Sequence, residues 1–208
     1  MEQRGLRSFE PRVYSVFGHN VVPWTQPLPV GRRLVERAYN AAIRLGDLAF
    51  ASFSRVELVL TSYFEGDQLG EVQREAQATL DFGRHAKFNL IVLLMTSYVQ
   101  HIRTLRGLTA AFGSFNETGF DEQRFEERLA EDPQLSIVAC QYWLFRLTAH
   151  LYAGAHSVAL EAASNARSLL WTQTSFFTLA HYHFFAALSL AGRWDRPQTR
   201  SAPITARL

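Results

Sequence analysis

Apolar residues recur at intervals of three and four positions along most of this chain, and this spacing restricts the fold more than any other feature. Residues three and four apart share one face of an α-helix, whereas a β-strand requires alternation. In the segment 32–45 the apolar face consists of Leu34, Val35, Ala38, Tyr39, Ala42 and Leu45. The same spacing marks the segment 72–83, and the apolar segments 48–64 and 88–105 also predict helices.

The apolar runs 89–99 and 137–147 are compatible with helices and with buried strands. Their length and their content of Leu, Met, Ala and Gln favour helices. No stretch alternates in the manner of a strand, and no Asn-Gly or Asp-Gly hairpin turn occurs. We therefore expect an all-α protein.

Four glycines divide the helical pattern into units. Gly66, Gly107, Gly154 and Gly192 each follow a segment rich in Leu or aromatic residues, at intervals of 41, 47 and 38 residues. Glycine suits the position after a helix because it adopts left-handed backbone angles without steric cost. A helix–turn–helix unit repeated at this length is typical of helical solenoids, although the tetratricopeptide unit has only about 34 residues.

These units predict a tetratricopeptide-like array over residues 1–192, in which antiparallel helix pairs stack into a right-handed solenoid. The clearest unit follows Gly154, where Ala159, Ala163 and Ala166 recur at intervals of four and three. Small residues at these positions would let the second helix of a pair approach its neighbour closely. The alternative is an ordinary helical hairpin within a bundle that has no repeats.

Two segments break the helical pattern. Residues 108–120 predict a long loop with aromatic anchors, and a short charged helix follows over 121–131 before Asp132-Pro133 ends it, so that the interruption spans 108–133. Asp121 is well placed for the positive end of that helix. Residues 193–208 are rich in Arg, Pro, Gln, Thr and Ser without periodicity, and they predict a disordered tail.

Composition argues against several classes of protein. The net charge is only +2, which gives no strong attraction to nucleic acid. The longest strongly apolar run, Leu90–Met95, is far shorter than the ~20 residues that span a bilayer. Residues 1–7 lack the apolar stretch of a signal peptide, so we expect a cytoplasmic protein. The single cysteine, Cys140, lies in an apolar run and is expected to be a small core residue.

No motif for a chemical reaction is present. The chain lacks a phosphate-binding loop, a dinucleotide-binding glycine motif, a kinase catalytic loop, a nucleophile elbow and a zinc-protease motif. The one local histidine pair, His181 and His183, is spaced so that the two rings would point away from each other on a helix. We therefore expect no catalytic residue, no cofactor and no metal site.

Six runs of the chain form a recognisable set: FGHNVVPW at 17–24, GDLAFA at 46–51, EVQREA at 71–76, IRTLRGLT at 102–109, FGSF at 112–115 and LWTQTSFF at 170–177. The set resembles the tetratricopeptide-like region of very large bacterial sensor proteins, over roughly residues 1–192. Those proteins combine a serine/threonine-kinase-like domain, an AAA or STAND-type ATPase, a GAF domain and a histidine kinase. The resemblance implies that the chain is a fragment of such a protein and carries no catalytic residue of its own.

The leading hypothesis is therefore an interaction or sensing module that contacts a protein or the neighbouring domains of a parent kinase. From the register of the glycine turns, we expect seven residues to face a binding groove: Phe53, Leu60, Ser97, His101, Gln141, Thr148 and Tyr182. Exposed repeat ends also predict self-association.

Other readings remain open: a free-standing adaptor, a helical enzyme, and a decayed fragment without a function. A further one is a small-molecule sensor with an apolar cavity among Phe176, Phe177, Tyr182, Phe184 and Phe185.

Overall fold

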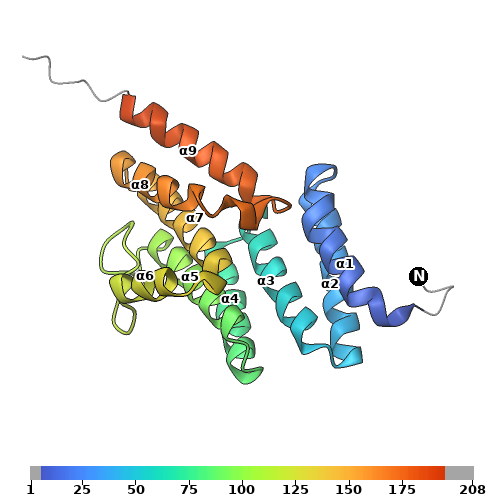
Figure 1. Cartoon of the computed structure of the whole chain (residues 1–208). Coiled ribbons are helices and arrows are strands. Elements are labelled where there is room, and N and C mark those ends of the chain that lie inside the picture. Colours follow the sequence, from blue (N-terminus) through green and yellow to red (C-terminus); the bar gives the residue numbers. More distant parts are fainter. Residues whose placement is uncertain (1–5, 195–208) are drawn as a thin grey trace, which may run out of the picture.

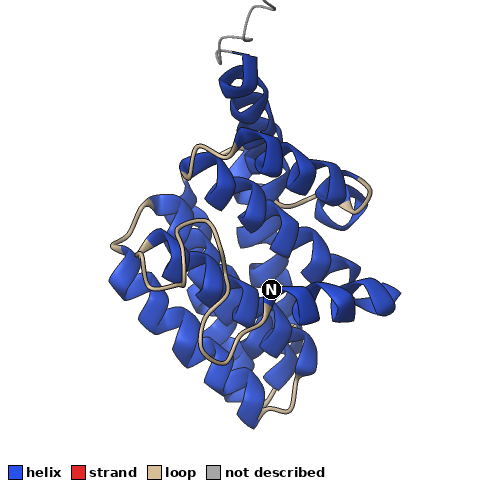
Figure 2. Cartoon of the chain, turned by 90° about the vertical axis from the view of Figure 1, so that its left-hand side faces the viewer, coloured by secondary structure: helices blue, strands red, loops and turns tan. Residues whose placement is uncertain are grey.

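The computed structural model describes residues 6–194, and every regular element in that range is helical (Figure 2). The α-helices are α1 Glu10–Val16, α2 Leu28–Leu45, α3 Leu48–Glu65, α4 Leu69–His85, α5 Asn89–Leu105, α6 Glu122–Glu131, α7 Ser136–Tyr152, α8 His156–Arg167 and α9 Thr178–Trp194. The described residues contain no strand, only an isolated bridge between Glu117 and Phe120. The all-α prediction is confirmed.

The helical turns of residues 10–24 were not predicted from the spacing of apolar residues. After α1 the chain forms a π turn, η3 (Phe17–Val21), and a 3-10 turn, η4 (Val22–Trp24). Gly18 of η3 lies against Gly31 of α2, where a Cβ atom on Gly31 would come within 2.3 Å of the Gly18 carbonyl oxygen. The absence of both side chains therefore allows this segment to cross α2 at backbone distance.

Three of the four predicted glycine stops end their helices with a left-handed residue. Gly66, Gly107 and Gly154 have φ angles of 81°, 70° and 70°. Gly192 is a correction, because it lies inside α9. A Cβ atom there would come within 2.3 Å of the His156 ring, so this glycine lets α9 lie against the start of α8.

The predicted end of the helical domain therefore moves from residue 192 to at least residue 194, and the predicted tail can begin no earlier than residue 195. Residues 193 and 194 belong to α9, and residues 195–208 lie outside the described residues. The disorder predicted for them stays a prediction.

Neighbouring helices pack in pairs: α2 with α3, α4 with α5, and α7 with α8 (Figure 1). The odd-numbered helices also contact one another in succession, from α1 to α3, α5, α7 and α9. We call these five helices the odd row. The short helix α6 lies against α7.

The core has two parts, which meet at α7. The larger part lies between α3, α4, α5, α6 and α7, with Tyr142, Phe145 and Ile91 among its fully buried side chains. The smaller part joins α7, α8 and α9. Ala159, Ala163 and Ala166 are buried there, so the close approach predicted for this helix pair is confirmed.

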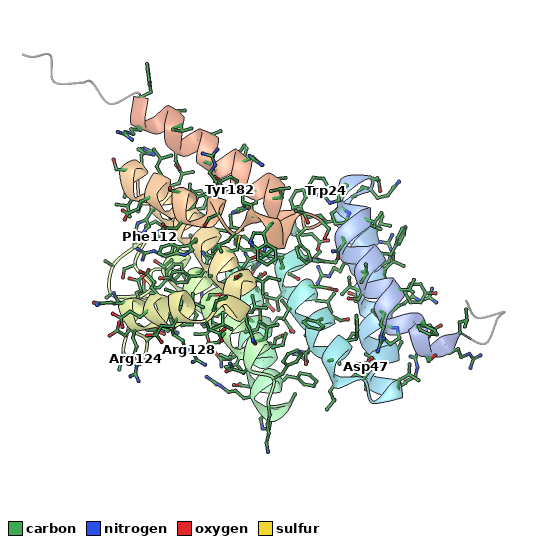
Figure 3. The ribbon with its side chains drawn as sticks, viewed as in Figure 1. Trp24, Asp47, Phe112, Arg124, Arg128 and Tyr182 are labelled. Atoms are coloured by element: carbon green, nitrogen blue, oxygen red, sulfur yellow. The ribbon has the colours of Figure 1, made fainter. Side chains whose placement is uncertain are left out.

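The loop 108–121 is held by a buried carboxylate. Glu122 accepts hydrogen bonds from the Phe115 backbone N–H at 2.8 Å and from the Ser114 hydroxyl at 3.0 Å, and it pairs with Arg146. Phe115 is fully buried as a loop anchor, whereas Phe112 is exposed (Figure 3). The predicted loop with aromatic anchors is thus present, with one of its aromatic residues outside the core.

Segments from the two halves of the chain meet. Asn20 donates a side-chain hydrogen bond to the Ser175 hydroxyl at 2.8 Å, and Trp24 Nε1 donates to the Ser175 carbonyl at 3.2 Å. The Trp24 ring also lies edge-on to Phe177, with 6.3 Å between ring centroids. Figure 3 shows Trp24 beside the connector that leads into α9. Through these contacts η3 and η4 lie against the connector between α8 and α9.

Candidate functional site

The seven residues expected to face a groove all lie on the odd row, on α3, α5, α7 and α9. Six of them are buried: Leu60, Ser97, His101, Gln141, Thr148 and Tyr182. Phe53 is half-buried and packs against Phe88 and Phe50. Because six of the seven are buried, they line no open groove in the described residues. Their role in binding a partner stays a prediction.

His101 and Tyr63 form the polar centre of this interior. The Tyr63 hydroxyl lies 2.9 Å from His101 Nε2, and the imidazole stacks on Phe145 with ring centroids 4.3 Å apart. Burial, with a smaller contribution from nearby His181, lowers the pKa of His101 to about 3. Its Nδ1 atom has no hydrogen-bond partner. At neutral pH the ring is therefore uncharged and serves packing.

A second imidazole extends this interior towards α9. His181 Nε2 lies 2.7 Å from the Thr148 hydroxyl, and its ring stacks on Phe185. Burial lowers the pKa of His181 to about 4. Across residues 6–194, no group of three or more His, Cys, Asp or Glu side chains is arranged to hold a metal ion. Cys140 is buried and its thiol pKa is raised to about 11 by burial, which confirms its assignment as a core residue.

The aromatic residues near α9 serve mainly as packing contacts. Phe176 lies 5.4 Å from the His19 ring, and Phe177 lies between Trp24 and Phe64. Tyr182 and Phe185 are buried, whereas Phe184 is 59% exposed. These contacts give no support to an apolar cavity at this position.

An open groove lies between α2 and α4, with α3 as its floor. Its volume is ≈ 700 Å³. Leu58 and Val59 of α3 and Val72 of α4 form its apolar base beside the hydroxyl-bearing Ser62, while polar side chains form both walls. The lining residues with polar or charged side chains on the walls and at the end are Arg32, Glu36, Tyr39, Arg55, Asp67, Gln68, Glu71, Glu75 and Thr79. We call this feature the α2–α4 groove.

Arg55 reaches across the floor of the α2–α4 groove. Its guanidinium lies over the Tyr39 ring of α2 at 5.8 Å and over the Phe82 ring of α4 at 5.4 Å. Its Nε atom donates to the Thr79 hydroxyl at 3.3 Å. No carboxylate pairs with Arg55 among the described residues, so its two terminal nitrogens remain available to an acceptor from a ligand.

Carboxylates outnumber arginines in the groove. Arg32 pairs with Glu65 at 2.6 Å and with Asp67 at 3.1 Å, and the hydrogen bond to Glu65 raises the pKa of its guanidinium. Glu36 also lies 3.6 Å from Arg32. The lining thus holds two arginines against four carboxylates, those of Glu36, Asp67, Glu71 and Glu75. A cationic group of a ligand would be attracted here.

Glu75 is the carboxylate best placed to accept such a group. It is exposed and forms no ion pair with any described residue, whereas Glu71 pairs with Arg74. A ligand cation at Glu75 would therefore not have to displace an internal partner. The groove thus offers an acceptor without an ion-pair partner, Glu75 on the α4 wall, and a donor, Arg55 on the floor, beside an apolar base.

Comparison with known proteins identifies no relative. No family model, no curated protein and no solved structure matches the chain. The resemblance to multidomain sensor proteins therefore stays a prediction from the sequence. Within residues 6–194, none of the helices has the length and apolar character needed to cross a membrane.

Sequence reasoning missed the α2–α4 groove, although a signal was present in α3. Apart from the terminal Glu65, this apolar helix carries only two charged residues, Arg55 and Glu57. Glu57 accepts hydrogen bonds from the Ser15 hydroxyl at 2.9 and 2.8 Å, and burial raises its pKa to about 7. A charged residue within an apolar helix indicates either a specific internal partner or a binding site. Here Glu57 has an internal partner, Ser15, and Arg55 lies in the α2–α4 groove.

Proposed function

We propose that this chain is a non-catalytic interaction module that holds an extended protein segment with a basic side chain in the α2–α4 groove. The observation that supports it is the pair of unpaired charges in the groove, Arg55 on the floor and Glu75 on the wall, beside an apolar base. A peptide supplies both complements, because its carbonyl oxygens accept hydrogen bonds and its Lys or Arg side chains carry positive charge.

The expected contacts follow from the positions of these groups. Arg55 donates to a main-chain carbonyl of the segment, and Glu75 receives its cation. Aliphatic portions of the segment cover Leu58, Val59 and Val72. Charge-assisted hydrogen bonds contribute about 1.5–3 kcal/mol when shielded from water and less when exposed, so we expect modest affinity.

The architecture is compatible with this role. Helix pairs stacked in a row, with left-handed glycines in several of the turns, favour the tetratricopeptide-like array predicted from the sequence, and such arrays bind extended segments. We infer that the segment belongs to a neighbouring domain of a cytoplasmic sensor protein or to a separate protein partner.

A displayed random-peptide library selected on the immobilised chain tests this proposal. The enriched peptides should contain Lys or Arg, and fluorescence titration should show binding about tenfold weaker, or ~1.4 kcal/mol, in Glu75→Lys. Glu131→Lys is the matched control, because Glu131 is exposed on α6, away from the groove. Selection of acidic or purely apolar peptides, or equal losses in both variants, would contradict the proposal.

Arg55→Ala tests the floor of the groove separately. This change should also weaken binding about tenfold. Arg55 contacts Tyr39 and Phe82, so the change could also affect the fold. The circular dichroism spectrum and thermal midpoint of the Arg55→Ala protein must therefore be compared with those of the wild type. Unchanged affinity in a folded Arg55→Ala protein would exclude Arg55 as a donor to the ligand.

A further inference from the structure

The outward face of α9 is mainly apolar from Phe184 to Trp194, with the exposed His183 at its beginning. Leu188 is 42% exposed, Phe184 and Leu190 are each 59% exposed, and Trp194 is 88% exposed. Ala187 and Ala191 are exposed between them. The opposite side of α9, with Thr178, Tyr182, Phe185 and Ser189, is buried against α7 and α8. We call the exposed side the outer face of α9.

Charged groups are almost absent from this helix. α9 contains no Asp, Glu or Lys, and its only charged residue is Arg193. Other helices, such as α4, direct charged residues towards solvent. An apolar helix face at the edge of the array (Figures 1 and 2) is typical of a surface that another apolar surface covers.

The spacing of large and small residues on the outer face is self-complementary. If two copies of α9 pack antiparallel about a two-fold axis between Ala187 and Leu188, then Phe184 of one copy faces Ala191 of the other. In the same arrangement Ala187 faces Leu188. Large side chains thus meet small ones at these two central steps, which allows close helix packing there. A two-fold axis uses the same face on both copies and closes after two.

The available area agrees with a weak dimer. If all six side chains were fully covered they would contribute roughly 600 Å² per copy, so a pair buries at most roughly 1,200 Å² through them, the lower limit for a specific interface. α9 itself contributes no acidic group to the contact.

We propose that a second copy of this chain docks antiparallel on the outer face of α9 and forms a reversible homodimer. The proposal is independent of the α2–α4 groove, which lies on other helices. A second apolar surface, at the N-terminal end, includes Phe9, Val13, Val16 and Phe17. Contact between that surface and α9 would instead generate an open head-to-tail chain, because two different faces would meet.

Sedimentation velocity on the full chain over a range of concentrations distinguishes these arrangements. The wild type should shift reversibly from monomer to dimer. Ala187→Glu places a charge at the proposed axis and should weaken the dimer at least tenfold. Val13→Glu places the same charge on the N-terminal surface and should leave it unchanged. Because Ala187 and Val13 are both exposed, each variant should retain the wild-type thermal midpoint.

Disulfide trapping tests the geometry. Under oxidising conditions Ala187→Cys should give a covalent dimer, and Val13→Cys should stay monomeric. The native Cys140 is fully buried and does not interfere.

Three results would overturn the proposal: a wild type that stays monomeric at all concentrations, loss of association in Val13→Glu, or no crosslinking of Ala187→Cys. A chain ending at Trp194 that dimerises when the full chain does not would identify residues 195–208 as the occupant of this face instead.

Discussion

Arg55 and Glu57 lie only two positions apart in α3, yet they serve different parts of the molecule. Positions two apart on a helix point in different directions. Arg55 accordingly reaches the α2–α4 groove, and Glu57 reaches Ser15 of α1. One charge remains available to a ligand, and the other is used in the contact between α1 and α3.

The buried carboxyl of Glu57 leads to a prediction about how the free energy of unfolding depends on pH. Burial raises its pKa from 4.5 to about 7, so the folded chain keeps this proton over a pH range in which the unfolded chain has lost it. The free energy of unfolding therefore falls as pH rises from about 4.5 to about 7. Glu57→Gln removes this ionisation and should stabilise the protein by ~1–3 kcal/mol at pH 8.

Urea unfolding at pH 8 and at pH 4 measures this effect. The gain from Glu57→Gln should be small at pH 4, where the carboxyl is protonated in both states. Glu75→Gln, at an exposed site, should show no comparable gain. A Glu57→Gln protein less stable than wild type at pH 8 would show that the ionised carboxylate is favoured in the fold.

Four histidines have the opposite effect on the pH dependence, because they lower stability as the pH falls. Burial is the main cause that lowers the pKa of His101 to about 3 and those of His19, His150 and His181 to about 4. The unfolded chain binds these protons near pH 6.5, whereas the folded chain resists them. Stability should therefore be lost as pH falls from about 6.5 to about 4.

Thermal unfolding from pH 7.5 down to pH 4.5 measures the sum of these effects. On lowering the pH, four histidines reduce the free energy of unfolding and one carboxyl raises it. We therefore expect the thermal midpoint to fall across this range. A constant or rising midpoint would contradict the burial of these rings.

At the scale of the element, local sequence predicted the helices well. The helix expected over 48–64 occupies Leu48–Glu65, and the one expected over 121–131 begins one residue later. Asp121 caps the latter by accepting a hydrogen bond from the Arg124 backbone N–H at 3.0 Å. Helix bounds and caps depend on residues close together in the chain, so the sequence pattern can predict them.

The errors arose where a contact between distant elements decides the structure. Gly192 resembles a helix stop in the sequence, but its small size is required beside His156, 36 residues earlier. The π turn η3 similarly depends on the crossing of Gly18 and Gly31. Periodicity cannot distinguish a glycine needed for backbone angles from one needed for space.

The crossing of η3 and α2 gives a prediction for the element. Gly31→Ala places a Cβ atom 2.3 Å from the Gly18 carbonyl oxygen and should destabilise the protein by ~1–3 kcal/mol through overpacking. Gly70→Ala, in α4, is the matched control, because its Cβ atom would meet only Arg106, at 4.0 Å. This second change should be neutral or stabilising by up to ~1 kcal/mol. Urea unfolding of both variants tests the contact, and equal effects would contradict it.

At the scale of the whole molecule, the sequence and the structure lead to different candidate binding faces. Register assigned His101, Thr148 and Tyr182 to a groove, whereas in the structure they lie buried on the odd row. It could not show that the odd row packs against itself, or that Asn20 and Trp24 contact Ser175 from the other half of the chain. Which face of an array stays open depends on curvature, and curvature depends on contacts far apart in the sequence.

Other surface features do not match the groove in their chemistry. Arg124 and Arg128 project from α6 beside the loop 116–121, where they form an exposed basic edge (Figure 3). The α2–α4 groove combines an apolar base with charges of both signs. We therefore place recognition of a protein segment in the groove and leave α6 as support for α7.

Hydrogen–deuterium exchange of the chain, with and without the tightest peptide from the library, tests this placement most directly. We expect slower exchange in α4, in the C-terminal half of α3 and over residues 32–39 of α2, which line the α2–α4 groove, with α5 and α7 unchanged. Protection confined to α5, α7 or α9, with none in α2 and α4, would contradict it and move the binding site to the odd row.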